Sequence, residues 1–329
     1  MKPVLFFITL FPAVLSAQLA PTPKPPPPKA YDSPAATDED FPFQGEYVGE
    51  KDGKRHGVQV IALGDQKFEA VGYNGGLPGD GWDGDRATVT RTQGTREDGG
   101  TSVHFEREEL QGEADGVKIY VTKKGGGEVM ELERVDRHSP TLGAAAPAGA
   151  VVLFGGKDAN DFTGSQVTGD GLLTQGATSK EKFGDFTLHI EFRLPYMPAA
   201  RGQGRGNSGI YLQGRYELQM LDSFGLEGKD NECGGIYKTA SPKQNMCFSP
   251  LTWQTYDIDF TAAKMDAEGK KTANAKVTVK HNGVIIHEGL ELPGVTGGAL
   301  SKEDGTPGPI HLQNHGNPVR YRNIWVVKK

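Results

Sequence analysis

Residues 207–222, NSGIYLQGRYELQMLD, carry the pattern that decides the fold. Apolar side chains occupy most of the even positions of this stretch: Ile210, Leu212, Tyr216, Leu218 and Met220. Alternation with a period of two is typical of a β-strand that buries one face and exposes the other. We therefore expect one or two half-buried strands here, with a turn near Gly214.

Polar side chains occupy most of the odd positions: Asn207, Tyr211, Gln213, Arg215, Glu217 and Gln219. Amide, carboxylate and guanidinium groups can hydrogen-bond pairs of hydroxyls, and an aromatic ring can stack on a sugar. This face therefore predicts a carbohydrate-binding surface. The alternative is the ordinary solvated outer face of an antiparallel sheet.

The composition favours strands over helices and argues against nucleic acid as a partner. The 329 residues are enough for two domains, and their net charge of -6 offers no basic surface for phosphates. With 46 glycines, 21 prolines and 36% hydrophobic residues, the chain suits many short strands joined by turns. We therefore expect an all-β protein.

The N-terminus has the features of an export signal. Residues 1–17 combine a lysine, an apolar run and a small-residue end at Ser16-Ala17, which predicts a signal peptide and an exported protein, periplasmic or extracellular. No later stretch reaches the roughly 18 apolar residues of a membrane helix, so no transmembrane segment is expected. Residues 18–40 include PTPKPPPPK, which predicts a disordered, proline-rich linker.

Two β domains follow. Residues 41–137 alternate in several segments, such as KFEAVGY and GVKIYVTKK, and predict a smaller β-rich sandwich or barrel of unknown function. Residues 138–150 form an Ala/Pro linker. Residues 151–329 hold longer strands and an Asn282-Gly283 hairpin signal, and predict a two-sheet antiparallel sandwich of the jelly-roll or lectin type.

The only cysteines, Cys233 and Cys247, lie fourteen positions apart. In an exported chain this spacing predicts a disulfide that closes one loop and stabilises it by about 3 kcal/mol. Two buried thiols or a metal site are the alternatives. No further ligands stand at zinc spacing, so no metal site is expected.

Further polar candidates lie near the C-terminus and in one loop. The strand PIHLQNHG contributes Gln313 and, at its end before a glycine, His315; the strand RYRNIW contributes Arg322. The glycine-rich loop RGQGRG, residues 201–206, is expected at the mouth of the groove. Conventional glycosidases place two carboxylates around the scissile bond. Glu217 and Asp222 are the available pair, but their spacing of five puts them on opposite faces of a strand.

Several motifs together resemble those of the 3-keto-disaccharide hydrolase domain, a bacterial family of exported, concanavalin A-like sandwiches. They are LFGGKD at 153–158, the stretch at 207–222, CGGIY at 233–237, PLTWQTYDIDF, HNGVIIHEG and GPIHLQNHGNPVRYRNIWV. The resemblance covers about residues 151–329 and not the first β domain. One departure is Gln213 in LQG, where the family usually has L-R-G.

The resemblance implies cleavage of glycosides that already carry a ketone at carbon 3. Such a ketone acidifies the hydrogen on carbon 2, so one general base can remove it, and the aglycone then leaves from carbon 1 before water adds. A partner dehydrogenase would supply the keto sugar.

Carried onto this sequence, Glu217 or His315 is the base and the other is the acid. Gln219, Gln313 and Arg322 bind the sugar or stabilise the enolate, while Tyr211 and Lys238 line the groove. Asn207, Gln213, Arg215 and Asp222 complete the predicted sugar-binding set. No cofactor is expected; a divalent cation would assist enolate formation, although no ligand cluster in the sequence demands one. The alternative function is a non-catalytic, lectin-like carbohydrate-binding protein.

Overall fold

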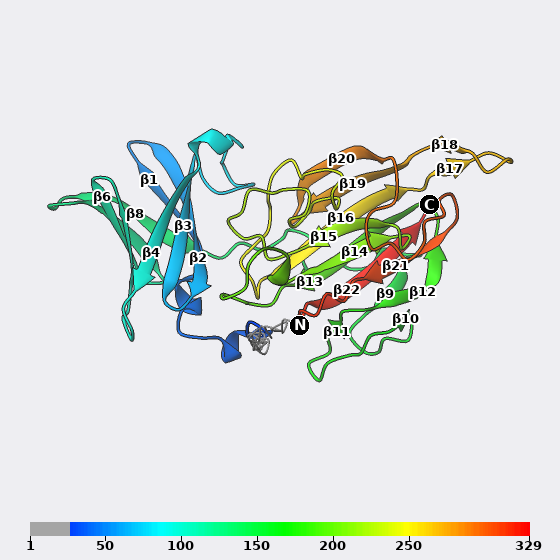
Figure 1. The fold of residues 1–329 in the computed structure, drawn as a ribbon, viewed down its shortest axis with the longest axis horizontal. Coiled ribbons are helices and arrows are strands. Elements are labelled where there is room, and N and C mark those ends of the chain that lie inside the picture. The colour runs from blue at the N-terminus through cyan, green and yellow to red at the C-terminus, as the bar shows by residue number, and fades with distance from the viewer. Residues whose placement is uncertain (1–26) are drawn as a thin grey trace, which may run out of the picture.

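The computed structural model describes residues 27–329 and is all-β, with 22 strands and, apart from four short 3₁₀ turns, no helix in this part of the chain (Figure 1). The predicted fold class is confirmed. The predicted signal peptide and residues 18–26 of the predicted linker lie outside the described residues. Within residues 27–329, no helix is long and apolar enough to cross a membrane. The 3₁₀ turns are Pro34–Ala36, Phe41–Phe43, Arg86–Thr88 and Gly202–Gly204.

The first domain is a closed barrel of eight antiparallel strands that follow one another in sequence order. Its strands are β1 Gly45–Lys51, β2 Lys54–Gly64, β3 Lys67–Asn74, β4 Thr90–Arg96, β5 Val103–Arg107, β6 Leu110–Ala114, β7 Lys118–Lys123 and β8 Glu128–Val135. Alternate residues point into the barrel, so Val60, Ala62 and Phe68 form part of an interior core, whereas Ile61 and Val71 pack on its outside.

The second domain is a sandwich of two antiparallel sheets. The five-stranded sheet runs in the order β10-β12-β21-β14-β15, and its strands are β10 Phe162–Thr163, β12 Thr178–Phe183, β14 Ser208–Leu212, β15 Tyr216–Met220 and β21 Gly308–Leu312. The other sheet runs in the order β11-β22-β13-β16-β19-β20, with β9 paired to β22. Its strands are β9 Val151–Phe154, β11 Leu173–Thr174, β13 Phe186–Arg193, β16 Trp253–Thr261, β19 Ala275–His281, β20 Val284–Leu292 and β22 Arg320–Lys328. A separate hairpin joins β17 Lys264–Met265 to β18 Lys271–Ala273.

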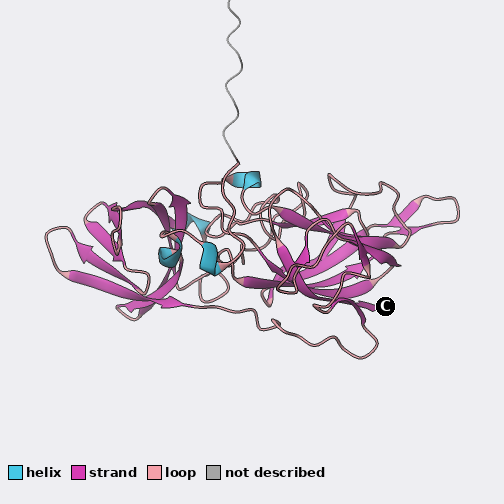
Figure 2. Cartoon of the chain, turned by 90° about the horizontal axis from the view of Figure 1, so that it is seen from below, coloured by secondary structure: helices cyan, strands magenta, loops and turns pink. Residues whose placement is uncertain are grey.

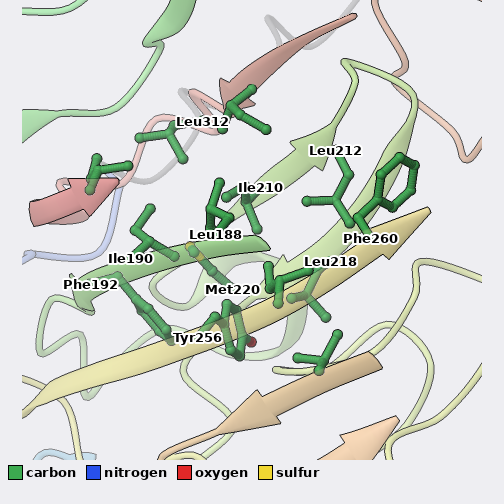
Figure 3. Packing of buried hydrophobic residues seen from close by; sticks show 14 of the residues in the cluster. Leu188, Ile190, Phe192, Ile210, Leu212, Leu218, Met220, Tyr256, Phe260 and Leu312 are labelled. Carbon is green, nitrogen blue, oxygen red and sulfur yellow. The ribbon is translucent and has the colours of Figure 1, made fainter. Parts of the chain in front are cut away.

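The core of the sandwich lies between the two sheets (Figure 3). The five-stranded sheet contributes Ile210, Leu212, Leu218 and Met220, the even positions that the alternation predicts, and they pack against side chains such as Phe192 of the other sheet. The polar face of β14 and β15 is not half-buried as predicted: every residue of both strands is buried, because loops cover that face as well.

The linker prediction for residues 18–40 is wrong for its described C-terminal part. Tyr31 exchanges backbone hydrogen bonds with Tyr196 of the sandwich, and the Asp32 carboxylate lies 2.7 Å from the Arg320 guanidinium. Asp40 is buried and receives hydrogen bonds from Arg96 of the barrel at 2.8 and 3.2 Å. These polar contacts hold the segment between the two domains.

The segment 138–150 that joins the two domains lies against the outer face of the seven-stranded sheet. The Ser139 hydroxyl is 2.6 Å from that of Thr255, and the Gly143 amide donates to Glu191 at 2.6 Å.

The two domains share a packed interface, and Figure 2 shows them from below, side by side. Phe224, from the loop after β15, is 2% exposed and packs in one apolar cluster with Ile61, Val71, Tyr73 and Leu77 of the barrel. We expect a phenylalanine buried in this way to couple the folding of the two domains.

The predicted disulfide is not formed. Cys233 and Cys247 are both free and buried, which is the buried-thiol alternative. The Cys233 sulfur lies 3.3 Å from the Tyr256 hydroxyl, and the Cys247 sulfur lies 3.4 Å from the Phe248 carbonyl oxygen. Hydrogen bonding inside the core thus satisfies both thiols.

Replacing Phe224 by alanine should lower the free energy of unfolding by about 3–5 kcal/mol, because it removes a fully buried apolar contact between the sandwich and the barrel. Denaturant unfolding followed by tryptophan fluorescence would measure this. The control Val117→Ala alters a side chain that is 65% exposed and should change stability by less than about 0.5 kcal/mol. A Phe224→Ala protein as stable as the control would contradict the coupling.

Candidate functional site

A polar pocket of about 210 Å³ lies on the outer face of the five-stranded sheet. Strands β14 and β15 and the end of β21 form its floor, and loops form its walls. Its lining residues are Gln203, Asn207, Tyr211, Glu217, Gln219, Tyr237, Gly297, Gly298, Gln313 and His315. The pocket thus brings together both predicted catalytic residues, Glu217 and His315, with Asn207, Tyr211, Gln219 and Gln313 of the predicted sugar-binding set.

The pairing of β14 with β15 positions the carboxylate of the pocket. Tyr211 and Glu217 are direct cross-strand partners, and the Tyr211 hydroxyl donates to Glu217 Oε2 at 2.8 Å. Gly209 makes room for this carboxylate, because a Cβ at residue 209 would lie 2.4 Å from Glu217 Oε1. The Glu217 side chain therefore lies over the neighbouring strand at a place where only a glycine fits.

Burial changes the acidity of Glu217. The residue is 2% exposed, and loss of solvation raises the pKa of its carboxyl to about 7, although the hydrogen bond from Tyr211 acts in the opposite direction. The same burial, together with the charge of Glu217, raises the pKa of the Tyr211 hydroxyl, which therefore stays protonated as a donor. A carboxyl with a pKa near neutrality can serve as a general base.

Glu217 differs from the other buried carboxylates of residues 27–329 in having no cationic partner. Arginine pairs with each of the others, at distances from 2.5 to 2.8 Å: Asp40 with Arg96, Glu46 with Arg137, Glu191 with Arg322 and Asp222 with Arg205. A buried charge without a partner is unfavourable and is found where function requires it. This contrast singles out Glu217 independently of any family resemblance.

Amide side chains form a network beside the carboxylate. Gln219 Nε2 donates to Asn207 Oδ1 at 3.1 Å, and Asn207 Nδ2 donates to the Gln203 carbonyl oxygen at 2.7 Å. Gln313 Nε2 donates to the Tyr211 hydroxyl at 3.1 Å. The Oε1 atoms of Gln219 and Gln313 are buried without a hydrogen-bond partner among the described residues. Both pocket amides therefore have a free acceptor for a ligand hydroxyl.

Four lining residues were missed because they lie in loops without periodicity: Gln203, Tyr237, Gly297 and Gly298. Gln203 belongs to the loop expected at the mouth of the groove, and Tyr237 ends the CGGIY motif, so both carried a usable signal. The Tyr237 amide donates to the Glu217 carbonyl oxygen, which fixes this loop against β15. The two glycines carried no signal in the sequence.

The loop of Gln203 is also attached to the barrel. The Arg201 guanidinium donates to the Leu63 carbonyl oxygen at 2.7 Å. The Arg205 guanidinium lies 3.4 Å from the Ala62 carbonyl oxygen and also pairs with the Asp222 carboxylate at 2.6 Å. The barrel therefore supports one wall of the pocket through two main-chain carbonyls.

Five residues of the predicted sugar-binding set lie outside the pocket. Gln213 is in the turn after β14, where its Nε2 donates to the Phe183 carbonyl oxygen, and Arg215 donates to the carbonyl oxygen of Thr306. Lys238 is exposed, with its ammonium over the ring of Tyr237.

The other two are held in ion pairs. Asp222 pairs with Arg205, so it is not a second pocket carboxylate. Arg322 belongs to the other sheet, where it pairs with Glu191 at 2.6 Å and lies 4.1 Å over the Trp253 ring. Neither side chain is free to hold a sugar.

No group of three or more histidine, cysteine, aspartate or glutamate side chains within residues 27–329 is arranged to hold a metal ion. The pocket itself offers one carboxylate and one imidazole, with amide and tyrosine oxygens around them.

Comparison with known proteins identifies relatives of the sandwich. The family model described as a 3-keto-alpha-glucoside-1,2-lyase-like domain matches residues 149–327. The curated proteins include no significant match.

Solved structures from Parabacteroides distasonis ATCC 8503 are also similar. One crystal structure of a candidate glycosyl hydrolase is 36% identical, with a TM-score of 0.52, over 56% of this chain and 85% of that one. Two others with the same description have TM-scores of 0.40 and identities of 16% and 20%; they cover 55% of this chain and 94% and 99% of theirs.

The raised pKa of Glu217 predicts how stability depends on pH. The unfolded carboxyl ionises near pH 4.3 and the folded one near pH 7, so the folded state holds the proton more tightly between these values. The free energy of unfolding should therefore fall as pH rises from about 4.3 to 7. Glu217→Gln removes this pH dependence. Between pH 4.5 and pH 8, its free energy of unfolding relative to the wild type should therefore rise by an amount on the order of 3 kcal/mol.

Denaturant unfolding at several pH values would measure the gain. Glu191→Gln serves as the opposite control. Burial acts to raise the pKa of Glu191, but the nearby His189 imidazole and hydrogen bonds from Asn323 and Arg322 outweigh it and lower this pKa to about 2. Its stabilising contribution is present above about pH 4.3 and is lost as pH falls toward 2. Parallel pH dependence of Glu217→Gln and the wild type would contradict the raised pKa.

Proposed function

Because this chain belongs, through residues 149–327, to the family of 3-keto-alpha-glucoside-1,2-lyase-like domains, we propose that it cleaves 3-keto glycosides by elimination and hydration. This family and the resemblance to a candidate glycosyl hydrolase support a carbohydrate-active enzyme. The observation that supports cleavage of 3-keto glycosides is Glu217, which is buried without a cationic partner. It is the only carboxylate in a pocket lined by amides and tyrosines.

Glu217 is the general base in this proposal. It removes the proton from carbon 2, which the neighbouring ketone has acidified, and the resulting enolate carries its negative charge on the ketone oxygen. A carboxyl with a pKa of about 7 is a stronger base than an ordinary glutamate and remains ionised in half of the molecules at neutral pH. The hydrogen bond from Tyr211 keeps the carboxylate oriented.

His315 is the general acid. It is exposed and lines the same pocket, so it can protonate the aglycone oxygen as the bond from carbon 1 to that oxygen breaks. The electron pair of the enolate forms the double bond between carbons 1 and 2, and the aglycone leaves. Water then adds its hydroxyl to carbon 1 and a proton to carbon 2, which yields the free 3-keto sugar.

The free amide oxygens of Gln219 and Gln313 bind sugar hydroxyls in this scheme. A volume of about 210 Å³ is below the roughly 300–1,000 Å³ of drug-sized sites, which supports one enclosed sugar ring with the aglycone outside. One carboxylate is enough for this chemistry, whereas conventional glycosidases require two.

The sequence also supports two proposals about the biological setting. Residues 1–17 have the pattern of a signal peptide, which supports export to the periplasm or the exterior. The substrate requires a dehydrogenase that oxidises carbon 3 of the glycoside, and this enzyme is the expected partner in the reaction sequence.

The first test is a time course with a 3-keto glucoside and with its unoxidised parent, in which aglycone release is measured. Release from the keto sugar alone is expected, with kcat rising as pH passes through about 7. Release from both would indicate a conventional glycosidase, and binding without release from either would favour the lectin-like alternative. Glu217→Gln should lower kcat by about 10²–10⁴-fold, while the exposed control Glu227→Gln should not change it.

Gly209→Ala tests the positioning of the base. The added Cβ would lie 2.4 Å from Glu217 Oε1 and 2.9 Å from its Cγ, so the carboxylate must move. A 1 Å displacement of a catalytic group can cost on the order of 10²-fold in rate, and kcat should fall by about that factor while the protein stays folded. Gly169→Ala, which meets nothing within 4 Å, is the control. Unchanged kcat in Gly209→Ala would contradict the role of Glu217 as base.

A further inference from the structure

The barrel domain has no match in the family model, yet its interior is filled at one end only. At the filled end, interior side chains such as Val60, Phe68 and Val103 are fully buried. At the other end, Val58, Val121 and Met130 face the interior but are only partly buried. A barrel of eight strands is just wide enough for its own side chains to fill it or to hold one small ligand.

Small side chains on the wall keep the second end open. They are Ala70, Gly72, Thr90, Thr92 and Gly112, and together with larger side chains they line an open-ended cavity of about 180 Å³. Gly112 is informative because nothing in its backbone requires a glycine. Its φ is not positive, and a Cβ there would meet Phe105 and Ile119 at ordinary contact distances of 3.7 to 4.0 Å. The absence of a side chain at residue 112 leaves space.

The chemistry of the wall defines the class of ligand. Val58, Phe105, Ile119 and Leu132 supply an apolar lining, and Thr90 and Thr92 add hydroxyls. The exposed Arg107 and Gln111 contribute a guanidinium and an amide. Neither hydroxyl hydrogen-bonds another side chain within residues 27–329, so both are available to a polar group of the occupant. An apolar cavity of about 150 Å³ engineered in another protein binds benzene, which shows that a cavity of this size can hold one aromatic ring.

We propose that the open end of the barrel binds a small molecule of about one aromatic ring that carries one hydrogen-bonding group. The ring packs between Phe105, Val121 and Met130, and its polar group meets Thr90 and Thr92. This site is separate from the pocket of Glu217 and shares no residue with it, so it stands whether or not the sandwich cleaves 3-keto glycosides.

The test uses 4-methylphenol as the probe on the full-length protein. Isothermal titration calorimetry measures affinity, and the methyl NMR signal of Met130 reports the position of the probe. Wild-type protein should bind 4-methylphenol at one site and shift that signal, whereas glucose should not. Gly112→Leu fills the cavity and should weaken binding at least tenfold.

Glu113→Leu is the matched control, because it places the same side chain at the adjacent, exposed position of β6. It should bind within about twofold of the wild type. If Gly112→Leu does not melt cooperatively, Ala70→Leu, which fills the cavity from β3, replaces it.

Absence of binding by the wild type at millimolar 4-methylphenol would overturn the proposal, as would equal binding by the wild type and a folded cavity-filling variant. Light scattering adds a further outcome. A dimer that Gly112→Leu dissociates would mean that a second copy of the chain covers this end, and it too would overturn the proposal.

Discussion

The pairing of Tyr211 with Glu217 across β14 and β15 is the contact on which the rest of the site depends. Period-two alternation places the even residues of these strands in the core and leaves the odd residues on the outer face. That face would ordinarily be solvated, but loops bury it as well. Burial on both sides removes Glu217 from water and raises its pKa to about 7, so the chemistry of the pocket follows from how the sheet is covered.

The covering loops are themselves held by polar contacts that reach the barrel. The wall that carries Gln203 is fixed by Arg201 and Arg205 to the Leu63 and Ala62 carbonyls, and Arg205 also neutralises Asp222. Phe224 adds an apolar contact to the same interface. The barrel thus contributes to the geometry of a pocket to which it donates no lining residue.

Sequence alternation predicted the strands, the core face and the side chains that lie on strands, which include Tyr211, Glu217 and Gln219. It failed where the chain leaves regular structure. Gln213 and Gly214 take φ values of 54° and 66° in the turn, so parity no longer applies to Gln213 and Arg215. Arg322 has suitable chemistry, but β22 lies in the other sheet, and sheet membership depends on long-range pairing that a local pattern does not contain. The loop glycines 297 and 298 line the pocket through their position alone.

The groups that face the buried carboxylates explain why Glu217 differs from the others. Asp40, Glu46, Glu191 and Asp222 each pair with an arginine, which balances the buried charge and fixes neighbouring segments together. An arginine beside Glu217 would lower its pKa and weaken it as a base, whereas a tyrosine hydroxyl orients the carboxylate with a smaller effect on its acidity. A hydroxyl partner therefore favours proton transfer, and an arginine partner favours structural stability. The same side chain, buried to a similar degree, serves either purpose according to the charge of the group that faces it.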